Sequence, residues 1–430
     1  MRTAIIGSGL TGLTAGYRLA RAGHHIEVFE QNEFAGGLAS AIRAGNENLD
    51  RFYHHIFVSD SDLISLSEEL NIDGTINWYE PKNAIFLGNC LYPFTTPVDL
   101  IRFKPISIFS RIRMGMTVLN AKLIRDYRHL ESVTARDWII KHSGKDTYEK
   151  IFAPLLCSKF DTDADDISGT WIWNKFKLRG SSRGKNFFKE KLGYMDGGFI
   201  TLANALIGKI SEYGGVIMLN ARAERIEKAA NGKWHVFTQK GIFEYDTILF
   251  TCAPQVLAEI CRLPEDYERH LNALRYKSNL CLLLELSKSL SSYYWITVSQ
   301  KDIPFVLMIE HTNLVGMKEY GSHIVYLSRY LDLENQLFNA SDNEITGKFI
   351  SGIKKVFPDF KEEYILRARL HRARFAQPVI TLNYNNLMPG IKTPLEGLYL
   401  ASMAQIHPED RGLNYSVQLG EAAAKTILGG

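Results

Sequence analysis

The sequence predicts an α/β protein in which a domain built on a parallel sheet is interleaved along the chain with a second domain of mixed sheet and helices. Three observations predict this organisation. The first thirty residues read as strand, glycine-rich turn, helix and strand, which is a βαβ unit. Buried strands return at residues 246–253 and 397–401, and the β-rich residues 276–331 lie between them. Two interleaved domains fit this order better than two consecutive ones.

The βαβ unit is recognised by its hydrophobic spacing. Residues 3–6 form a short apolar strand, residues 10–22 have apolar side chains at helical intervals, and residues 25–30 alternate as a second strand that ends at Glu30. The turn between the first strand and the helix has the pattern G-x-G-x-x-G, formed by Gly7, Ser8, Gly9, Leu10, Thr11 and Gly12. In this context the pattern predicts a Rossmann-type dinucleotide-binding turn.

Each residue type in this turn has a physical role. Gly7 permits the tight turn, Gly9 lets the backbone approach a pyrophosphate, and Gly12 lets the helix pack closely on the strand. The helix N-terminus offers amide donors and the positive end of its dipole to phosphates. Glu30, followed by Gln31, lies where a carboxylate accepts hydrogen bonds from the adenosine ribose and repels a 2′-phosphate. A glycine-rich turn without a ligand is the alternative.

A second glycine motif follows the acidic residue closely and consists of Gly36, Gly37, Leu38 and Ala39. A glycine doublet in this place resembles the second fingerprint of FAD proteins in the amine oxidase superfamily. That superfamily includes flavin amine oxidases, protoporphyrinogen oxidases, phytoene desaturases and, more distantly, UDP-galactopyranose mutases. The resemblance implies that the cofactor is FAD and that the parallel sheet belongs to a Rossmann-type FAD-binding domain of the GR2-like kind.

Three later segments agree with this resemblance. Residues 197–202 are similar to the family's G-G-x-x-x-L element, and residues 246–254 to its strand that ends in Ala-Pro beside the cofactor. Residues 398–401 and the following glycines resemble the C-terminal flavin segment, whose last helix points its N-terminus at the cofactor. One departure is Ser402-Met403, where many members have Gly-acid. The resemblance adds these residues to the expected FAD site: Pro254, Ser402, Gly412, Leu413 and Asn414.

The order of these segments sets the expected domain boundaries. The FAD-binding domain takes residues 1–77, 192–265 and 385–430. The substrate domain takes residues 78–191, which include a helical region, and residues 266–384.

Two segments supply candidate catalytic residues. Residues 50–57 fall where the superfamily chain passes the flavin ring, and they contain His54 and His55. A histidine there could hydrogen-bond the flavin or shuttle a proton, because its pKa lies near working pH; a purely structural histidine is the alternative. The polar segment 405–415 contains Arg411, which could stabilise negative charge on a reduced flavin. A solvated loop is the alternative for this segment.

Basic residues cluster in two places. Residues 175–191 hold seven cations against the single acid Glu190. Within them Arg179, Arg183 and Lys185 stand among glycines and serines that are typical of a mobile loop. These three cations are expected to bind a phosphate or carboxylate, which makes the expected partner an anionic small molecule. A solvated surface run is the alternative.

The second basic cluster covers residues 100–125, which hold six cations and no acid. Apolar residues recur there every three or four positions, so that they share one helical face: Phe109, Ile112, Met116, Leu119 and Leu123. Such a stripe could lie on an anionic membrane, as in some monotopic relatives, or pack onto its own domain. The expected location is therefore cytoplasmic, with or without peripheral attachment to the inner face of a membrane.

Composition excludes several classes of protein. The 46% hydrophobic and 23% charged residues are those of an ordinary globular protein, and a net charge of +3 is too small to argue for nucleic acid. The five cysteines form no C-x-x-C pair, so neither a disulfide framework nor a metal site is expected. Because a strand begins at residue 3, we expect no signal peptide, and we expect no membrane-spanning segment because the sequence contains no apolar run of 18 or more residues.

Three functions follow, in order of preference. The first is an FAD-dependent oxidoreductase of the amine oxidase/protoporphyrinogen oxidase type, in which a C–H or C–N centre of an anionic or partly apolar substrate gives a hydride to flavin N5. The second is a mutase similar to UDP-galactopyranose mutase, in which reduced FAD acts as a nucleophile on a nucleotide sugar. The third is a flavin-free binding protein on the same scaffold, similar to Rab GDP-dissociation inhibitors; the intact glycine motif and Glu30 disfavour it.

Overall fold

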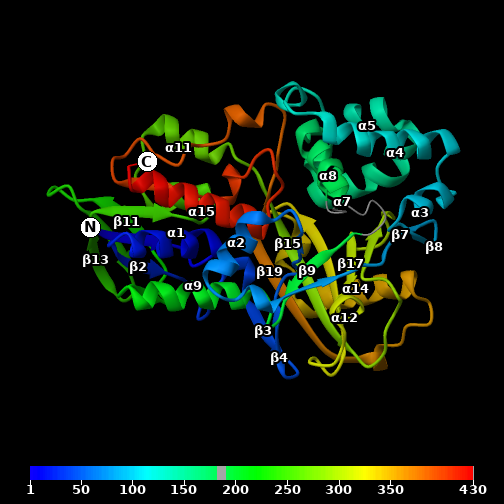
Figure 1. The fold of residues 1–430 in the computed structure, drawn as a ribbon, viewed down its shortest axis with the longest axis horizontal. Helices are drawn as coiled ribbons and strands as arrows, with labels where there is room; N and C mark the ends of the chain where they lie inside the picture. Colours follow the sequence, from blue (N-terminus) through cyan, green and yellow to red (C-terminus); the bar gives the residue numbers. More distant parts are fainter. Residues whose placement is uncertain (182–189, 430) are drawn as a thin grey trace.

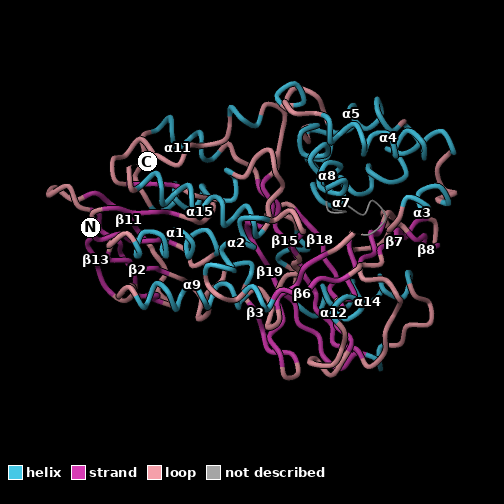
Figure 2. Tube along the Cα trace, in the orientation of Figure 1, coloured by secondary structure: helices cyan, strands magenta, loops and turns pink. Residues whose placement is uncertain are grey.

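The computed structural model describes residues 1–181 and 190–429, and Figure 1 shows two units side by side. The parallel-sheet unit carries both chain termini and contains the parallel sheet with its covering layers. The mixed-sheet unit contains a larger sheet, above which lies a group of helices formed by residues 97–181. Figure 2 shows that this group, the helical lobe, consists of helices and loops.

Five parallel strands form the first sheet in the order β10-β2-β1-β14-β20. Their bounds are β1 (Arg2–Ile6), β2 (His25–Phe29), β10 (Val216–Met218), β14 (Thr247–Phe250) and β20 (Leu398–Leu400). Strands β1, β2, β14 and β20 coincide within a few residues with strands predicted from the sequence, so the Rossmann-type sheet is confirmed. The strands come from three separate stretches of chain, whereas the domain boundaries themselves stay a prediction.

Both faces of the parallel sheet are covered, because alternate side chains of each strand point to opposite faces. Ile5 and Leu249 pack against helices on one face, and Ala4 and Phe250 pack against an antiparallel meander on the other. The helices are α1 (Leu10–Arg21), α9 (Ile200–Glu212) and α15 (Leu413–Ile427). The meander and the helices beside it are β11 (Arg225–Lys228), β12 (Trp234–Thr238), β13 (Gly241–Tyr245), α10 (Pro254–Ile260) and α11 (Glu265–Asn272).

The mixed sheet has seven strands in the order β19-β15-β18-β17-β16-β7-β8. They are β7 (Asn83–Leu87), β8 (Cys90–Pro93), β15 (Tyr276–Leu286), β16 (Trp295–Val298), β17 (Leu307–Glu310), β18 (His323–Leu331) and β19 (Ile365–Pro378). Strands β15 to β18 confirm the β-rich region predicted from the sequence. The sequence does not predict the long edge strand β19, because much of its arginine-rich sequence is exposed and shows no continuous buried face.

Helix α14 (Asp342–Val356) covers one face of the mixed sheet through Ile345, Phe349 and Ile353. Smaller elements complete the two units: β3 (Ala41–Ala44), β4 (Glu47–Asp50), β5 (Ile56–Phe57), α2 (Ser61–Glu69), β6 (Ile76–Tyr79), β9 (Leu192–Met195), α12 (Thr312–Val315) and α13 (Gln336–Asn339). Strand β9 pairs with β5 and β6 and so ties the start of the chain to its middle.

The helical lobe consists of α3 (Pro97–Arg102), α4 (Ile108–Leu123), α5 (Ala135–Ser143), α6 (Lys145–Thr147), α7 (Ala153–Phe160) and α8 (Gly169–Ser181). Helix α4 packs into the lobe through Met114 and Ala121, which are buried. Its opposite face carries the predicted apolar stripe, whose five residues are 49–76% exposed. The stripe therefore does not pack onto its own domain, and that alternative is wrong. Within residues 1–181 and 190–429, no helix has the length and hydropathy needed to cross a membrane.

Helices α1 and α15 lie side by side (Figure 1) and approach so closely that no side chain fits at Gly420. A Cβ there would lie 2.6 Å from the Thr11 carbonyl oxygen and 2.7 Å from the Cβ of Thr14. We expect Gly420→Ala to lower the free energy of unfolding by about 1–3 kcal/mol through overpacking. Urea denaturation followed by circular dichroism measures this change.

The matched control is Gly208→Ala, because Gly208 lies within helix α9 and a Cβ there would meet nothing within 4 Å. This substitution should raise the free energy of unfolding by about 0.5–1 kcal/mol, since alanine favours the helix. Equal effects of the two substitutions would contradict the close contact between α1 and α15.

Candidate functional site

A cavity of about 1410 Å³ opens where the parallel-sheet unit, the mixed sheet and the helical lobe meet. The glycine turn, the start of α15 and residues 51–55 line it together with side chains of α4, α7 and α8. Segments that are far apart in the sequence therefore share one chamber.

The glycine turn borders this cavity with backbone that no side chain covers. Gly7 has a φ of +108°, and a Cβ on Gly12 would lie 2.2 Å from the Gly7 carbonyl oxygen. A Cβ on Gly37 would lie 3.1 Å from the Cα of Gly9, so the two glycine motifs pack against each other. A Cβ on Gly9 itself would have nothing within 4 Å, and no side chain caps the first turn of α1. This uncapped helix terminus beside open space fits the diphosphate of a dinucleotide.

Glu30 is held at the cavity wall by four hydrogen bonds. Its Oε2 accepts from the backbone N of Ser8 at 3.1 Å and from the Ser8 Oγ at 2.7 Å. Its Oε1 accepts from the backbone N of Asn32 at 2.9 Å and from the Asn32 Nδ2 at 2.8 Å. A carboxylate held in one position beside the glycine turn suits the recognition of a ribose diol.

Most of the residues predicted to bind the cofactor line this cavity: Gly7, Ser8, Gly9, Leu10, Thr11, Glu30, Gln31, Gly36, Gly37, Leu38, Ala39, Gly412, Leu413 and Asn414. Gly12 does not line it, because it packs between α1 and β1. Pro254 is buried at the start of α10, and its neighbour Ala253 lines the cavity instead. The Ser402 side chain caps a short 3-10 turn, and Met403 takes its place in the wall. A role of Pro254 and Ser402 in binding the cofactor stays a prediction.

His54 and His55 both line the cavity, yet the protein shields their rings from bulk water. Burial lowers the pKa of His54 to about 3, helped by the charge of Arg411, and lowers the pKa of His55 to about 4. The His55 Nδ1 lies 3.2 Å from the Tyr294 hydroxyl, whereas the His54 Nδ1 has no partner among the described residues. Both rings are neutral near pH 7, and neither has the pKa near working pH that the sequence led us to expect.

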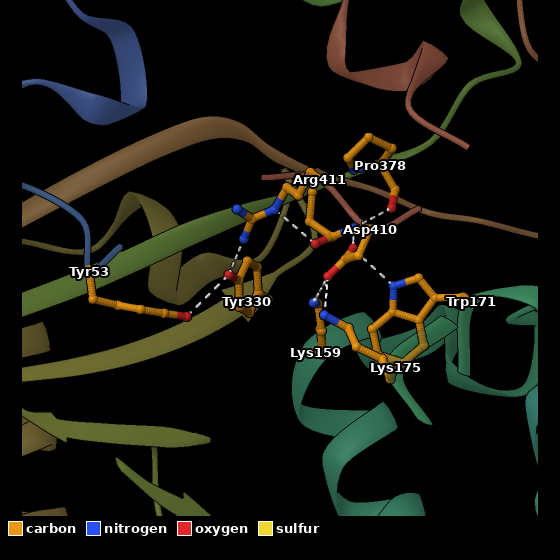
Figure 3. Close-up of polar contacts among 9 residues, drawn as sticks. Tyr53, Lys159, Trp171, Lys175, Tyr330, Pro378, Asp410 and Arg411 are labelled. Carbon is orange, nitrogen blue, oxygen red and sulfur yellow. Dashed lines mark hydrogen bonds and ion pairs between the residues drawn. The ribbon is translucent and has the colours of Figure 1, made fainter. Parts of the chain in front are cut away.

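Asp410 lies at the centre of a charged cluster in the same cavity (Figure 3). Lys159 from α7 and Lys175 from α8 both form ion pairs with its Oδ2, the former at 3.3 Å. The indole Nε1 of Trp171 donates to its Oδ1 at 3.0 Å. Burial acts to raise the pKa of Asp410, but the charges of Lys159, Lys175 and Arg411 outweigh burial and hold that pKa well below its usual range. Asp410 is therefore ionised at neutral pH.

Arg411 extends from the same loop toward the mixed sheet (Figure 3). Its Nε donates to the Gln377 Oε1 at 2.8 Å, and its guanidinium also donates to the Tyr330 hydroxyl. The Tyr330 hydroxyl lies 3.3 Å from the Tyr53 hydroxyl. The loop that carries Arg411 is thus packed against β18 and β19, and the alternative of a solvated loop is wrong.

The basic loop that the sequence predicts to bind the substrate lies largely outside the described residues. Arg183 and Lys185 lie outside the described residues, and Arg179 belongs to the last turn of α8. Lys159 and Lys175 line the cavity. No sequence motif indicates Lys159; its one signal is that it is the single charged residue in the apolar helix α7.

The helical lobe also gives the cavity an apolar wall, formed by Leu100, Met114, Val118, Leu119, Ile151, Phe152, Leu155, Ile172 and Phe176. Leu119 is at the same time a member of the exposed stripe on α4, with 55% of its surface accessible. Leu119 therefore joins the exposed stripe to the apolar wall of the cavity. A wall of this composition excludes water and suits an apolar group of a ligand.

A protein-family model matches nearly the whole chain: the family described as flavin containing amine oxidoreductase matches residues 10–428. Among curated proteins, zeta-carotene desaturase of Arabidopsis thaliana is 21% identical over 285 residues, which cover 59% of this chain and 50% of that protein. Protoporphyrinogen oxidase of Nicotiana tabacum is 26% identical over 190 residues, which cover 42% of this chain and 37% of that protein. The chain spans half or less of the length of these curated relatives.

Solved structures of similar fold cover the chain from end to end. Putrescine oxidase bound to putrescine is 14% identical, with a TM-score of 0.74 over 100% of both chains. Reduced UDP-galactopyranose mutase is 15% identical, with a TM-score of 0.73 over 100% of this chain and 94% of that one. At these identities the likeness concerns the fold alone. The family match confirms the expected superfamily and its flavin cofactor, and the structures confirm the expected scaffold.

Because burial lowers the pKa of both histidines, we expect neither His54 nor His55 to titrate between about pH 5 and 8. In protein labelled with carbon-13 at histidine Cε1, the ring signals of His54 and His55 should not move over this range in NMR spectra. The variants His54→Gln and His55→Gln assign the two signals by their disappearance. A midpoint at about pH 6.5 for either signal would contradict the shielding of that ring.

Proposed function

The chain belongs to the family of flavin-containing amine oxidoreductases, and on that premise we propose that it oxidises a C–H or C–N centre of a small molecule with FAD as hydride acceptor. The observation that carries the proposal is a single cavity that the glycine turn, Glu30 and the start of α15 share with an apolar wall and a charged cluster. A substrate in this chamber would lie against the cofactor. The cations and the apolar side chains favour a substrate that is anionic and partly apolar.

The glycine turn and α15 would hold FAD. The uncapped first turn of α1 would receive the diphosphate, and Glu30 would receive the adenosine ribose. The N-terminus of α15 begins at Gly412, which lines the cavity, and presents the positive end of a helix dipole there. FAD bound in this way supplies a two-electron hydride acceptor, and the chain supplies binding and orientation.

The chain's own residues would orient the substrate and keep water away from it. The apolar wall of the helical lobe excludes water from the chamber. His54 is neutral near pH 7 and has an unpartnered Nδ1 among the described residues, so it can make one further hydrogen bond. We therefore assign His54 as a hydrogen-bond partner rather than a proton shuttle, and His55, beside Tyr294, as a positioning residue. Arg411 would face developing negative charge.

The purified protein should show the visible absorption spectrum of a bound flavin and should release FAD on denaturation. We expect Glu30→Ala to weaken FAD binding by about tenfold to a hundredfold, because it removes a charge-assisted hydrogen bond of about 1.5–3 kcal/mol. Quenching of flavin fluorescence on addition of the apoprotein measures the affinity.

Glu33→Ala is the matched control, since Glu33 is exposed and does not line the cavity. Equal affinities of the two variants for FAD would contradict the proposed contact between Glu30 and the adenosine ribose. A colourless protein that takes up no added FAD would instead favour the flavin-free binding protein.

A mutase is the second candidate, and the cluster of Lys159, Lys175 and Arg411 beside the cavity favours it, because a nucleotide sugar carries phosphates. The test uses protein that is reduced anaerobically with NADH, NADPH or dithionite before UDP-galactopyranose is added. If only the reduced protein isomerises the sugar, the mutase becomes the favoured function. A flavin-bound protein that leaves the sugar unchanged in both states would keep the oxidoreductase first.

We also propose that the exposed stripe of α4 makes a peripheral contact with a membrane. Its apolar residues project from a segment rich in cations, a combination that binds the surface of an anionic bilayer. Because Leu119 belongs both to the stripe and to the cavity wall, an apolar substrate could pass between membrane and cavity along α4.

Phe109→Glu and Leu123→Glu replace two residues of the stripe that are each 76% exposed. Each should lower, several-fold, the fraction of protein that sediments with vesicles containing an anionic lipid, because a carboxylate opposes both burial and the surface charge. Ile242→Glu should leave sedimentation unchanged, since Ile242 is 64% exposed but lies on β13 of the other unit. Absence of sedimentation by the unaltered protein would contradict the proposed contact.

A further inference from the structure

The cluster around Asp410 contains more positive charge than its one carboxylate balances. Lys159 and Lys175 both pair with Asp410, while Arg411 pairs with no carboxylate among the described residues. All four side chains line the cavity. Positive charge that is partly removed from water and not balanced by a carboxylate raises the free energy of the folded protein unless an anion binds beside it. The cluster is therefore incomplete in the residues that the structure describes.

Figure 3 shows the three cations near Asp410 and the rings of Tyr330 and Trp171. The Lys159 Nζ lies 5.7 Å from the centroid of the Tyr330 ring, and the Arg411 Cζ lies 5.6 Å from the same centroid. The Nζ atoms of Lys159 and Lys175 lie 4.8 Å and 5.3 Å from the centroid of the Trp171 ring. Both ammonium groups also pair with the same Asp410 oxygen, and Arg411 follows Asp410 in the chain, so the three cations lie in one part of the cavity.

Hydrogen-bond donors remain at this point of the cavity. An ammonium group carries three N–H donors and a guanidinium carries five. In the described part of the chain, Lys159 donates to Asp410 alone, and its side chain is only 14% exposed. Arg411 donates to Gln377 and Tyr330. Glu190 also lines the cavity, but Asn83 of β7 donates to it.

We propose that Lys159, Lys175 and Arg411 together bind the anionic group of the substrate, a carboxylate or a phosphate, while the apolar wall of the helical lobe receives the rest of the molecule. This inference rests on the proposed function, because it names the substrate class of the same cavity: an amphipathic oxyanion. Asp410 is a positioning residue, since it holds the two ammonium groups side by side and does not itself favour an anion.

Binding of the anion is coupled to uptake of a proton at Lys159. Burial lowers the pKa of Lys159 to about 7; the charge of Asp410 opposes this, and the charges of Lys175 and Arg411 add to it. Tyr330 of β18 faces the same ammonium group. An anion stabilises the protonated form and raises this pKa, so the affinity for the anion falls as the pH rises through about 7.

Isothermal titration calorimetry of the FAD-loaded protein with octanoate, octyl phosphate and octanol tests the proposal. We expect both anions to bind and octanol to bind at least about tenfold more weakly, since it lacks charge-assisted hydrogen bonds. Lys175→Met should weaken octanoate binding by about tenfold or more, whereas Lys175→Arg should retain most of it. The tighter of the two anions identifies the group as a carboxylate or a phosphate.

Lys177→Met is the matched control, because Lys177 follows on the same helix, lies over the Trp173 ring at 4.8 Å and does not line the cavity. It should leave the affinity for octanoate unchanged. Titrations in two buffers of different ionisation enthalpy measure proton uptake, which should occur at about pH 7 to 8 in the unaltered protein and be absent in Lys159→Met. Thermal unfolding of each variant establishes that it is folded.

Octanoate binding that Lys175→Met leaves unchanged would overturn the proposal, as would octanol binding as tightly as octanoate. Calorimetry reports anion binding whether or not flavin is present, so the two proposals fail separately. A protein that binds FAD but neither anion retains the proposed function and loses the anion site. A protein that binds the anions but no FAD retains the anion site and loses the proposed function.

Discussion

Helix α1 can begin directly after the turn at Gly7 because Gly12 carries no side chain. A Cβ at Gly12 would lie 2.2 Å from the Gly7 carbonyl oxygen, so a larger residue would push the helix away from β1. This contact sets the direction in which the first amides of α1 point. Gly420 then seats α15 against α1 at a similarly close distance, and the start of α15 lines the same cavity. The cofactor side of the cavity therefore depends on contacts that only glycine permits.

Asp410 organises the opposite side of the cavity. It bonds to Lys159 and Lys175 of the helical lobe, and it also accepts from the Gln377 Nε2 of β19 at 3.3 Å. A carboxylate removed from water needs several such partners, and here the partners come from both the helical lobe and the mixed sheet. Lys277 of β15 makes a comparable link, since its buried ammonium pairs with Asp163 of the helical lobe at 2.8 Å. These ionic contacts hold the lobe over the mixed sheet and so shape the chamber between them.

Burial changes which groups carry protons at neutral pH. By residue type, histidines are the side chains expected to titrate near pH 7. In this fold burial lowers the pKa of His54 to about 3, and it lowers the pKa of Lys159 to about 7. Among the described residues that line the cavity, a lysine therefore responds to pH near neutrality, as does Asp60, whose pKa burial raises to about 6, whereas His54 is a neutral hydrogen-bonding ring. Removal of the charged form from water is the largest cause of both shifts.

The sequence by itself determined the features that depend on local spacing: the glycine turn, Glu30 at the end of β2, the strands around them and, through these motifs, FAD. It did not reveal β19, whose arginines obscure the strand pattern, or Lys159, which is 251 residues from its partner Asp410. Only the tertiary structure decided which side chains share the cavity, that the α4 stripe is exposed, and which groups titrate. The reason is physical, since exposure and the cost of removing a charge from water depend on neighbours brought from distant parts of the chain.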